Sequence, residues 1–590
     1  MKTTPARALN LSWMPLFLLA WFVGLIPAGS AQDEEPRRVG NYDFAGTTSF
    51  GYRFLDLNGN QAKYNQLLNL QEGFRVFDTQ LSFQSVETNQ GWFDRFSLAT
   101  QNLGGDPFPV IRVQLRKHGL YELRASYRAT QYFVNLPQTE LSTNREWIDR
   151  RRFGDLDLRY TPTRHLRFRF YYNRTERDGN EFSTGPFFYI PLAADVWSAF
   201  GRANVLPWTI PLEEKANLFG GGIDYRLGNT DIHLEQSYRT YNNPANLGGF
   251  GGQPIELLGP TSPALNLQVP QWNSFASFNI PMTQLRVDQR VTSHLQLRGG
   301  YIYTHASGPT GLDGVLLNRA VLTGSPAQPL AVNFLSAGTT DMTSHTGEVG
   351  FTLTLLERLD LVSDYRYQTF TESGKQSFQA IRSDLPTAFD LGSDLLNWDF
   401  GIHTLDTVLA FVPLNTLSAR AGLRFVKQDI VHQENGATAL GTRRSWYYAP
   451  IFNISWRPST KLKVMGQFEH QTTVDPYVRI TPEGTVGSNI KVHYSPSDRW
   501  GIENAWSFRN RETEMLDFEM RSRNNSTTVW YQPIAKIGLN AGFIYSSFFS
   551  QNTVAFLRGT PPLTGLFSTE QFIDRTYFWG LRANPVRDLT

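Results

Sequence analysis

The sequence has 590 residues, no cysteine and a net charge of +2 at pH 7. Charged residues make up 18% of the chain and aromatic residues 14%, whereas a typical soluble domain has about 25% charged residues. The absence of cysteine excludes disulfides, thiolate metal ligands, cysteine nucleophiles and covalent attachment of heme to this chain. The small net charge gives no reason to expect a nucleic-acid partner.

The amino terminus has the three parts of a secretory signal peptide. Lys2 and Arg7 are basic, residues 13–26 form an apolar run, and small residues precede a cleavage position after Ala31. The run is short for crossing a membrane, so we favour a cleaved signal over an uncleaved anchor. We therefore predict Sec-type export, with residues 1–31 removed and residues 32–41 forming a short periplasmic segment.

From residue 42 onward, apolar and polar residues alternate along the chain. The alternation is clearest in residues 111–116, 121–128, 166–170, 417–425 and 502–509. A period of two indicates strands with one apolar face and one polar face. A soluble sandwich would also alternate, but strands of about 10–13 residues match the length that crosses a bilayer at a tilt.

A short motif recurs between these strands: a large apolar residue, any residue, proline, three mostly polar residues, and another apolar residue. Its prolines are Pro162, Pro413, Pro458, Pro496 and Pro533. Proline cannot donate a ladder hydrogen bond, so we expect these segments at tight periplasmic turns. The aromatic residue two positions before each of these prolines would stand at the membrane interface.

Longer segments rich in Gly, Pro, Asn, Ser and Thr alternate with these short turns. Residues 176–214, 243–282, 305–342 and 372–396 are expected to be surface loops. The pattern predicts an all-β fold: a transmembrane, antiparallel, up-and-down β-barrel over residues 42–590, with about 22 strands (range 20–26). Because strand signals begin near Tyr42, we expect no plug domain before the barrel. Residues 583–589 repeat the turn pattern, which fits either a periplasmic tail or a sequence that lacks its last hairpin.

No catalytic or metal-binding motif is present, so we expect neither an enzyme nor a resident cofactor or metal ion. The alternation places charged residues on the polar face of the strands. The candidates for the barrel lumen are Arg112, Arg116, Arg124, Arg128, Arg167, Arg169, Arg420, Arg424, Asp155, Asp157 and Glu503. These charges either pair across a water-filled wall, or select ions or dock a partner within the lumen.

Two segments and the turn motif suggest a family. Residues 51–54 (GYRF), residues 63–67 (KYNQL) and the repeated aromatic-x-Pro turns resemble the MtrB/PioB-type porin–cytochrome barrels, which are associated with decaheme proteins. The resemblance implies an outer-membrane sheath around a periplasmic multiheme cytochrome that carries electrons across the membrane. Heme would then come only through the partner, in keeping with the lack of cysteine here. Some members of the family carry a CxxC near the amino terminus, and this chain does not.

Two functions follow as expectations. The first is the cytochrome sheath that the resemblance implies. The alternative is a general or anion-leaning diffusion porin for small solutes. Both would place the protein in the outer membrane of a Gram-negative bacterium, in contact with outer-membrane lipid.

Overall fold

The computed structural model describes thirteen segments of the chain. They are residues 37–58, 61–87, 91–135, 146–186, 205–248, 267–318, 330–382, 389–435, 437–476, 481–513, 517–534, 537–556 and 563–583. The predicted signal peptide (residues 1–31) and the turn-like segment after Ala583 lie outside the described residues.

The described residues form one antiparallel sheet of 23 strands, together with one short helix, α2 (Gln61–Leu67). The strands are β1 (Arg37–Val39), β2 (Tyr42–Arg53), β3 (Gly73–Ser85), β4 (Arg95–Leu103), β5 (Val110–Lys117), β6 (Tyr121–Asn135), β7 (Glu146–Thr163), β8 (Leu166–Pro186), β9 (Val205–Leu227), β10 (Thr230–Gly248), β11 (Leu267–Arg290), β12 (Leu295–Asn318), β13 (Leu330–Leu356), β14 (Leu359–Arg382), β15 (Phe389–Leu414), β16 (Leu417–Glu434), β17 (Ala437–Ser459), β18 (Leu462–Val474), β19 (Gly484–Ser497), β20 (Trp500–Thr513), β21 (Phe518–Ile534), β22 (Ile537–Phe556) and β23 (Leu563–Ala583).

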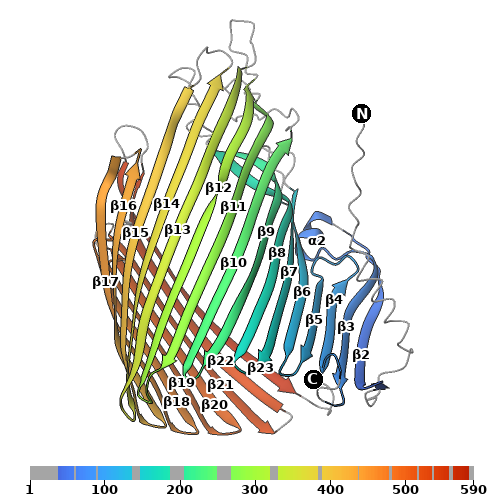
Figure 1. Ribbon diagram of the computed structural model, residues 1–590, viewed down its shortest axis with the longest axis vertical. Helices are drawn as coiled ribbons and strands as arrows, with labels where there is room; N and C mark the ends of the chain where they lie inside the picture. The colour runs from blue at the N-terminus through green and yellow to red at the C-terminus, as the bar shows by residue number, and fades with distance from the viewer. Residues whose placement is uncertain are drawn as a thin grey trace.

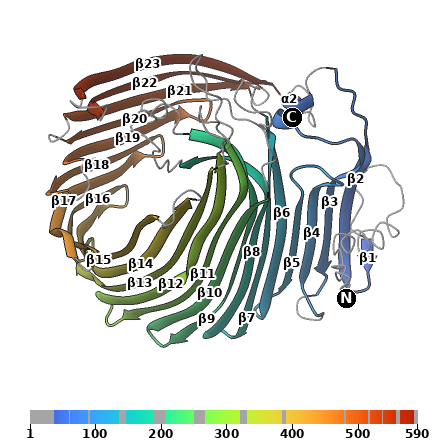
Figure 2. The same ribbon diagram turned by 90° about the horizontal axis from the view of Figure 1, so that it is seen from above.

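Each strand pairs with the next one along the chain, so the sheet is an up-and-down meander. The all-β antiparallel fold is confirmed, and the strand count falls in the expected range of 20–26. The sheet curves into a wall around a central space (Figures 1 and 2). It is not closed: among the described residues β23 pairs only with β22, and β1 covers only the first residues of β2.

Several expected boundaries are wrong. The segments predicted as long loops are largely strand, and β13 alone has 27 residues. The last strand, β23, has 21 residues, which is longer than the expected 10–13. β1 lies in the segment expected to precede the first strand. In parts of these segments, such as residues 306–311 (ASGPTG), small and polar residues interrupt the alternation. The backbone ladder does not depend on side-chain type and continues beyond the amphipathic part of each strand.

The proline motif has a single structural explanation, a β-bulge. Tyr160 pairs with Phe168 and Thr163 pairs with Leu166, so two residues of β7 lie opposite one residue of β8. Pro162 is the second of these two residues. The same shift occurs at the other four prolines. A bulge leaves a residue out of the ladder, so proline loses no hydrogen bond there.

The residues on either side of each proline also form specific bonds. The residue before it donates its N–H to the carbonyl of a neighbouring turn: Val412 to Arg358 at 2.9 Å, and Ser495 to Lys461 at 2.7 Å. Where a Ser or Thr follows the proline, as at Pro162, Pro458 and Pro496, its hydroxyl accepts an N–H of its own turn, as Ser459 does from Lys461 at 3.2 Å. The hydroxyl bonds are typical of Ser and Thr in turns, whereas the backbone bonds connect successive turns along the lower rim of Figure 1.

A buried ion pair joins β2, β3 and the β4–β5 connection at the end of these strands that lies away from the short turns. The Asp106 carboxylate accepts hydrogen bonds from Arg53 and from Nε of Arg75, the latter at 3.1 Å. The Arg75 side chain is only 4% exposed and that of Asp106 only 2%. Arg75 also donates to the carbonyls of Phe74, Gln71 and Glu72. The cluster therefore fixes the segment after α2 against the β4–β5 connection.

This cluster predicts a strong effect of Asp106→Asn on stability. The substitution leaves a buried guanidinium without its counter-charge, which typically costs about 3–5 kcal/mol. We expect a loss of this order in the free energy of unfolding measured by denaturant titration of the refolded protein. Asp78→Asn is the matched control, because within the described residues the Asp78 carboxylate accepts one side-chain hydrogen bond, from the Gln80 amide at an exposed position. Equal stability of the two variants would contradict the role assigned to Asp106.

Candidate functional site: the polar face of the sheet

Pairing register divides the wall into an apolar face and a polar face. Directly paired residues lie on the same face of a sheet, so a row of pairs can be followed from strand to strand. One such row from β8 to β17 consists of Leu166, Tyr225, Ile232, Val287, Gly299, Val349, Tyr365, Leu405, Phe425 and Tyr448. Every large side chain in this row is apolar or aromatic.

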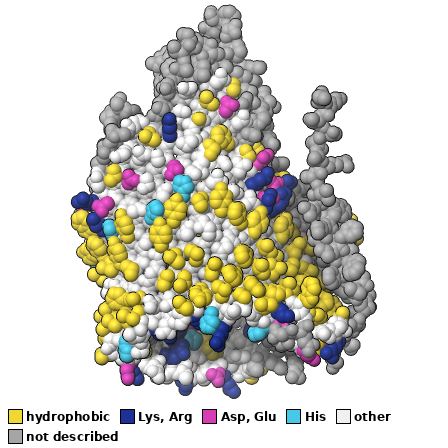
Figure 3. Space-filling model, in the orientation of Figure 1, with side chains coloured by type: hydrophobic (Ala, Val, Ile, Leu, Met, Phe, Trp, Pro, Cys, Tyr) yellow, Lys and Arg dark blue, Asp and Glu magenta, His cyan; other side chains and the backbone are white. Residues whose placement is uncertain are grey.

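The apolar face is the outer one. In Figure 3 hydrophobic side chains cover the lower half of the outer surface, and Lys, Arg, Asp, Glu and His side chains lie mainly above and below this band. Leu423 and Val349, both on this face, are 50% and 60% exposed. We refer to this band of outward apolar side chains as the apolar belt.

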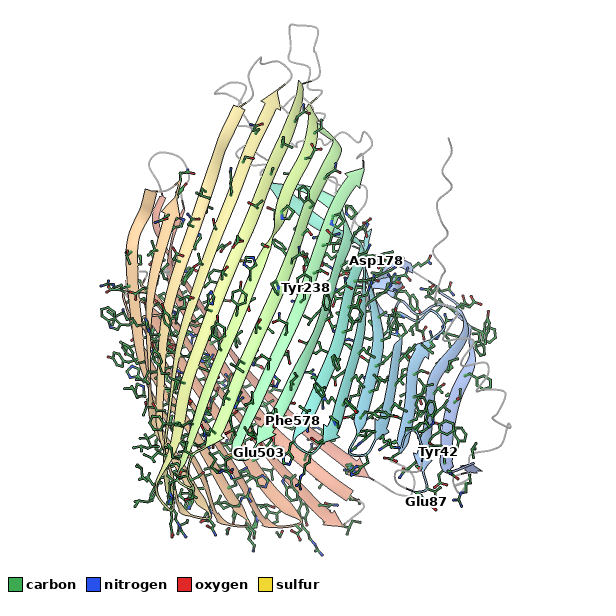
Figure 4. All side chains as sticks on the ribbon, viewed as in Figure 1. Tyr42, Glu87, Asp178, Tyr238, Glu503 and Phe578 are labelled. Atoms are coloured by element: carbon green, nitrogen blue, oxygen red, sulfur yellow. The ribbon has the colours of Figure 1, made fainter. Side chains whose placement is uncertain are left out.

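The opposite face is polar. A second row runs from Arg116 on β5 through Glu122, Arg159, Arg169, Gly222, Glu235, Gln284, Ile302, Thr346, Gln368 and Ile402 to Gln428 on β16. Residues i and i+2 of a strand lie on the same face, so the register shows which face each of the predicted lumen residues occupies. All eleven lie on the polar face: Arg112, Arg116, Arg124, Arg128, Arg167, Arg169, Arg420, Arg424, Asp155, Asp157 and Glu503. Figure 4 labels Glu503 near the turn end of the wall.

Four of these arginines, Arg124, Arg167, Arg169 and Arg424, form ion pairs with carboxylates. Nε of Arg169 donates to Asp157 at 2.8 Å, and its Nη1 lies 3.7 Å from Glu235 on β10. Arg424 on β16 donates to Asp406 on β15 at 2.7 Å. The carboxylates thus neutralise guanidinium groups of adjacent strands, and much of this face is electrically balanced without a ligand.

A denser cluster lies farther from the turns, and sequence reasoning missed it. Asp149 on β7, only 7% exposed, accepts hydrogen bonds from Arg151 at 2.7 Å and from Arg177 on β8 at 3.0 and 3.1 Å. Arg177 also reaches Glu214 on β9 at 3.5 Å. The run of three arginines at 150–152 indicates a concentration of positive charge, but it does not show which residues of other strands these side chains contact.

The Asp149 carboxyl is held in its charged form. Burial by itself raises the pKa of Asp149, but hydrogen bonds and charges from Arg151 and Arg177 outweigh it, so the net pKa lies below the ordinary value for aspartate. The cluster therefore stays ionised at neutral pH and ties β7, β8 and β9 together.

Aromatic side chains form a second feature of the polar face that was not predicted. Trp398 stacks on His432 with ring centroids 4.1 Å apart and on Phe400 at 5.9 Å. Phe370 contacts Phe400 edge-on. Register places these four rings on the same face as Arg424 and Asp406, so an apolar surface interrupts the charged one there.

The described residues offer no metal centre: no group of three or more His, Asp or Glu side chains among them could hold an ion. No helix within the described segments is long and apolar enough to cross a membrane.

Comparisons with known proteins give only distant structural similarity. No protein-family model matches the sequence, and no curated protein does. Among solved structures, the ferric yersiniabactin uptake receptor FyuA of Yersinia pestis aligns with 85% of this chain and 86% of its own, at 9% identity and a TM-score of 0.41. BauA, the ferric preacinetobactin receptor of Acinetobacter baumannii, aligns with 84% and 79%, at 12% identity and a TM-score of 0.40. Likeness at this level says nothing about ligand or transport chemistry.

The Asp149 cluster predicts an acid-sensitive contribution to stability. Because the folded pKa is below the unfolded one, the contribution is complete above the unfolded value of about 3.9 and is lost as pH falls through the folded value. We expect Asp149→Asn to lower stability at pH 7 and to flatten the acid limb of a stability–pH profile measured by denaturant titration. Asp574→Asn, on the edge strand and without an arginine partner in the described chain, should keep the wild-type profile. An unchanged acid limb in Asp149→Asn would refute the assignment.

Proposed function

We propose that this chain is an outer-membrane β-barrel protein whose polar face lines a passage across the membrane. The observation that carries the proposal is the division of the wall into an outer apolar belt and a charged face of the same strands. A membrane-spanning sheet requires this arrangement, because lipid contacts one face while the backbone bonds only within the sheet.

The height of the belt supports the same conclusion. On β16 the outward residues from Leu417 to Phe425 are all apolar, and the first outward charge is Lys427. Residues 417–425 span roughly 27 Å of extended strand, which a tilt of about 40° reduces to about 21 Å. Outer-membrane barrels have an apolar band about 25 Å tall. The short turns beneath the belt then face the periplasm.

A membrane barrel must also close its edges. The strands β2 to β23 alternate in direction, so β23 runs antiparallel to β2 and is suited to pair with it. On β23 the outward residues Tyr577 and Trp579 are 75% and 85% exposed, as expected for a strand that has a neighbour on one side only. We propose that β23 pairs with β2 in the membrane, with β1 displaced.

We propose that the barrel is a sheath that encloses a multiheme cytochrome within this passage. The support is the resemblance of residues 51–54, residues 63–67 and the proline turns to the porin–cytochrome barrels, together with the width of a wall with this many strands. Barrels of about 22 strands enclose a lumen that is usually filled. The aromatic surface around Trp398 and Phe400 would give a protein in the lumen an apolar contact.

The alternative, a diffusion porin, is favoured by a different observation. The ion pairs of Arg169 and Arg424 balance the polar face without a partner, which suits a water-filled wall. In that case the lumen would hold only water and solute.

One pair of measurements on the protein purified from native membranes in mild detergent separates the two functions. The sheath predicts a stoichiometric heme-staining partner and little conductance in planar bilayers while the partner is bound. A large, steady conductance without heme would overturn the sheath and support the porin. The absence of both heme and conductance would contradict either use of the passage.

The membrane orientation predicts unequal effects of charge on the two faces. Leu423→Arg puts a charge in the apolar belt at mid-strand and should cost roughly 2–4 kcal/mol of folding free energy in lipid vesicles. Gln114→Arg, on the polar face, should cost below about 1 kcal/mol, since Gln114 lies 2.9 Å from the Glu122 carboxylate. Denaturant unfolding from vesicles measures both. Equal costs would contradict the assignment of faces.

A further inference from the structure

A shallow cavity of about 490 Å³ lies on the polar face over β16–β19, and its lining contains two cations and no carboxylate. Five of its residues form what we call the amide patch: Arg420, Asn453, Gln467, Asn489 and Lys491. The volume is within the range of small-molecule sites, roughly 300–1,000 Å³.

Register explains how the patch is built. Arg420 on β16 pairs with Asn453 on β17, which pairs with Gln467 on β18, which pairs with Asn489 on β19. One row therefore presents a guanidinium and three amides side by side. Lys491 lies two residues beyond Asn489 on the same face. Three strand spacings separate β16 from β19, about 14 Å, so the two cations flank the amides from opposite sides.

The hydrogen-bonding groups of the patch are available to a ligand. Within the described part of the chain, none of its five side chains makes a hydrogen bond or an ion pair. By contrast Arg424, four residues after Arg420 on the same face of β16, forms an ion pair with Asp406. Two other cavities on the polar face contain carboxylates, among them Asp224 and Asp231 in one, and Asp364 and Asp406 in the other.

The surroundings give the patch a boundary. Glu469 lies two residues beyond Gln467 on β18 and shares its face. This carboxylate disfavours an anion on the side of the amide row away from the short turns, so an anionic ligand is favoured at Arg420 within the row and at Lys491 on the turn side of it. Coulombic attraction by two cations without paired acids is stronger than attraction by neutralised pairs.

The chemistry of the patch specifies a class of ligand. Amide side chains both donate and accept and therefore suit hydroxyl groups, while guanidinium and ammonium groups form strong charge-assisted bonds to carboxylates. We propose that the amide patch binds acidic, polyhydroxylated solutes of about disaccharide size, with carboxylates at Arg420 and Lys491 and hydroxyls on the amides between them. This rests on the proposed function in one respect, that the polar face lines a passage which solutes enter.

Equilibrium dialysis of the purified full chain in detergent tests the proposal with two probes of equal size, digalacturonate and maltose. We expect digalacturonate to bind and maltose to bind at least about tenfold more weakly. Arg420→Gln and Lys491→Gln should each weaken digalacturonate binding by roughly tenfold, the usual effect of losing one charge-assisted hydrogen bond. Added salt should weaken binding as well.

The matched control is Arg523→Gln, which removes the same charge from the outward face of β21, where Arg523 lies over the Phe508 ring. Its affinity for digalacturonate should equal that of the wild type, and circular dichroism should show the same strand signal in all variants. No binding, equal binding of the two sugars, or an equal loss in Arg523→Gln would overturn the amide patch. Heme content and conductance report on the passage separately, so digalacturonate binding without either would refute the proposed function and leave the patch standing.

Discussion

The backbone hydrogen-bond ladder is the constraint on which the rest of this structure depends. Pairing in fixed register forces every second side chain to the same side of the wall, and the row of pairs carries that assignment from strand to strand. A shift of one residue at a single strand would move Arg169 into the apolar belt and Phe170 onto the charged face. The wall therefore keeps two faces only if register is maintained across the whole sheet.

The proline turns are where register is controlled. Each bulge takes two residues of one strand against one of the next, and proline fits there because that position gives no hydrogen bond. The N–H before each proline connects its turn to a neighbouring one, so an error at one hairpin would break a bond to the next. Local turn chemistry at residues such as Ser459 thus supports a long-range property, the alignment of the two faces.

The amphipathic part of each strand could be predicted from the sequence, because the apolar belt requires apolar and polar residues to alternate along the strand. Leu417 to Phe425 and Leu166 to Phe170 show it plainly, and the polar-face residues Arg424 and Asp157 follow from it. The upper parts of β12 to β15 could not be predicted, since residues such as Gly308, Pro309 and Thr310 carry no periodicity although their backbones pair regularly. Cross-strand partnerships such as Asp149 with Arg177 depend on register between segments and leave no pattern in either segment alone.

Charge is distributed unevenly over the polar face, and this asymmetry follows from which residues the register pairs. From β5 to β15 many guanidinium groups face carboxylates on adjacent strands, so attraction is satisfied within the wall and holds neighbouring strands together. Over β16 to β19 the same rows contain Asn453, Gln467 and Asn489, which cannot neutralise Arg420. Ion-paired side chains stabilise the wall and present little net charge to its contents. Unpaired charged side chains remain able to attract a solute of opposite charge. In one sheet, the ion pairs of β5–β15 hold neighbouring strands together, while the cations of β16–β19 are available to the solute that we propose binds there.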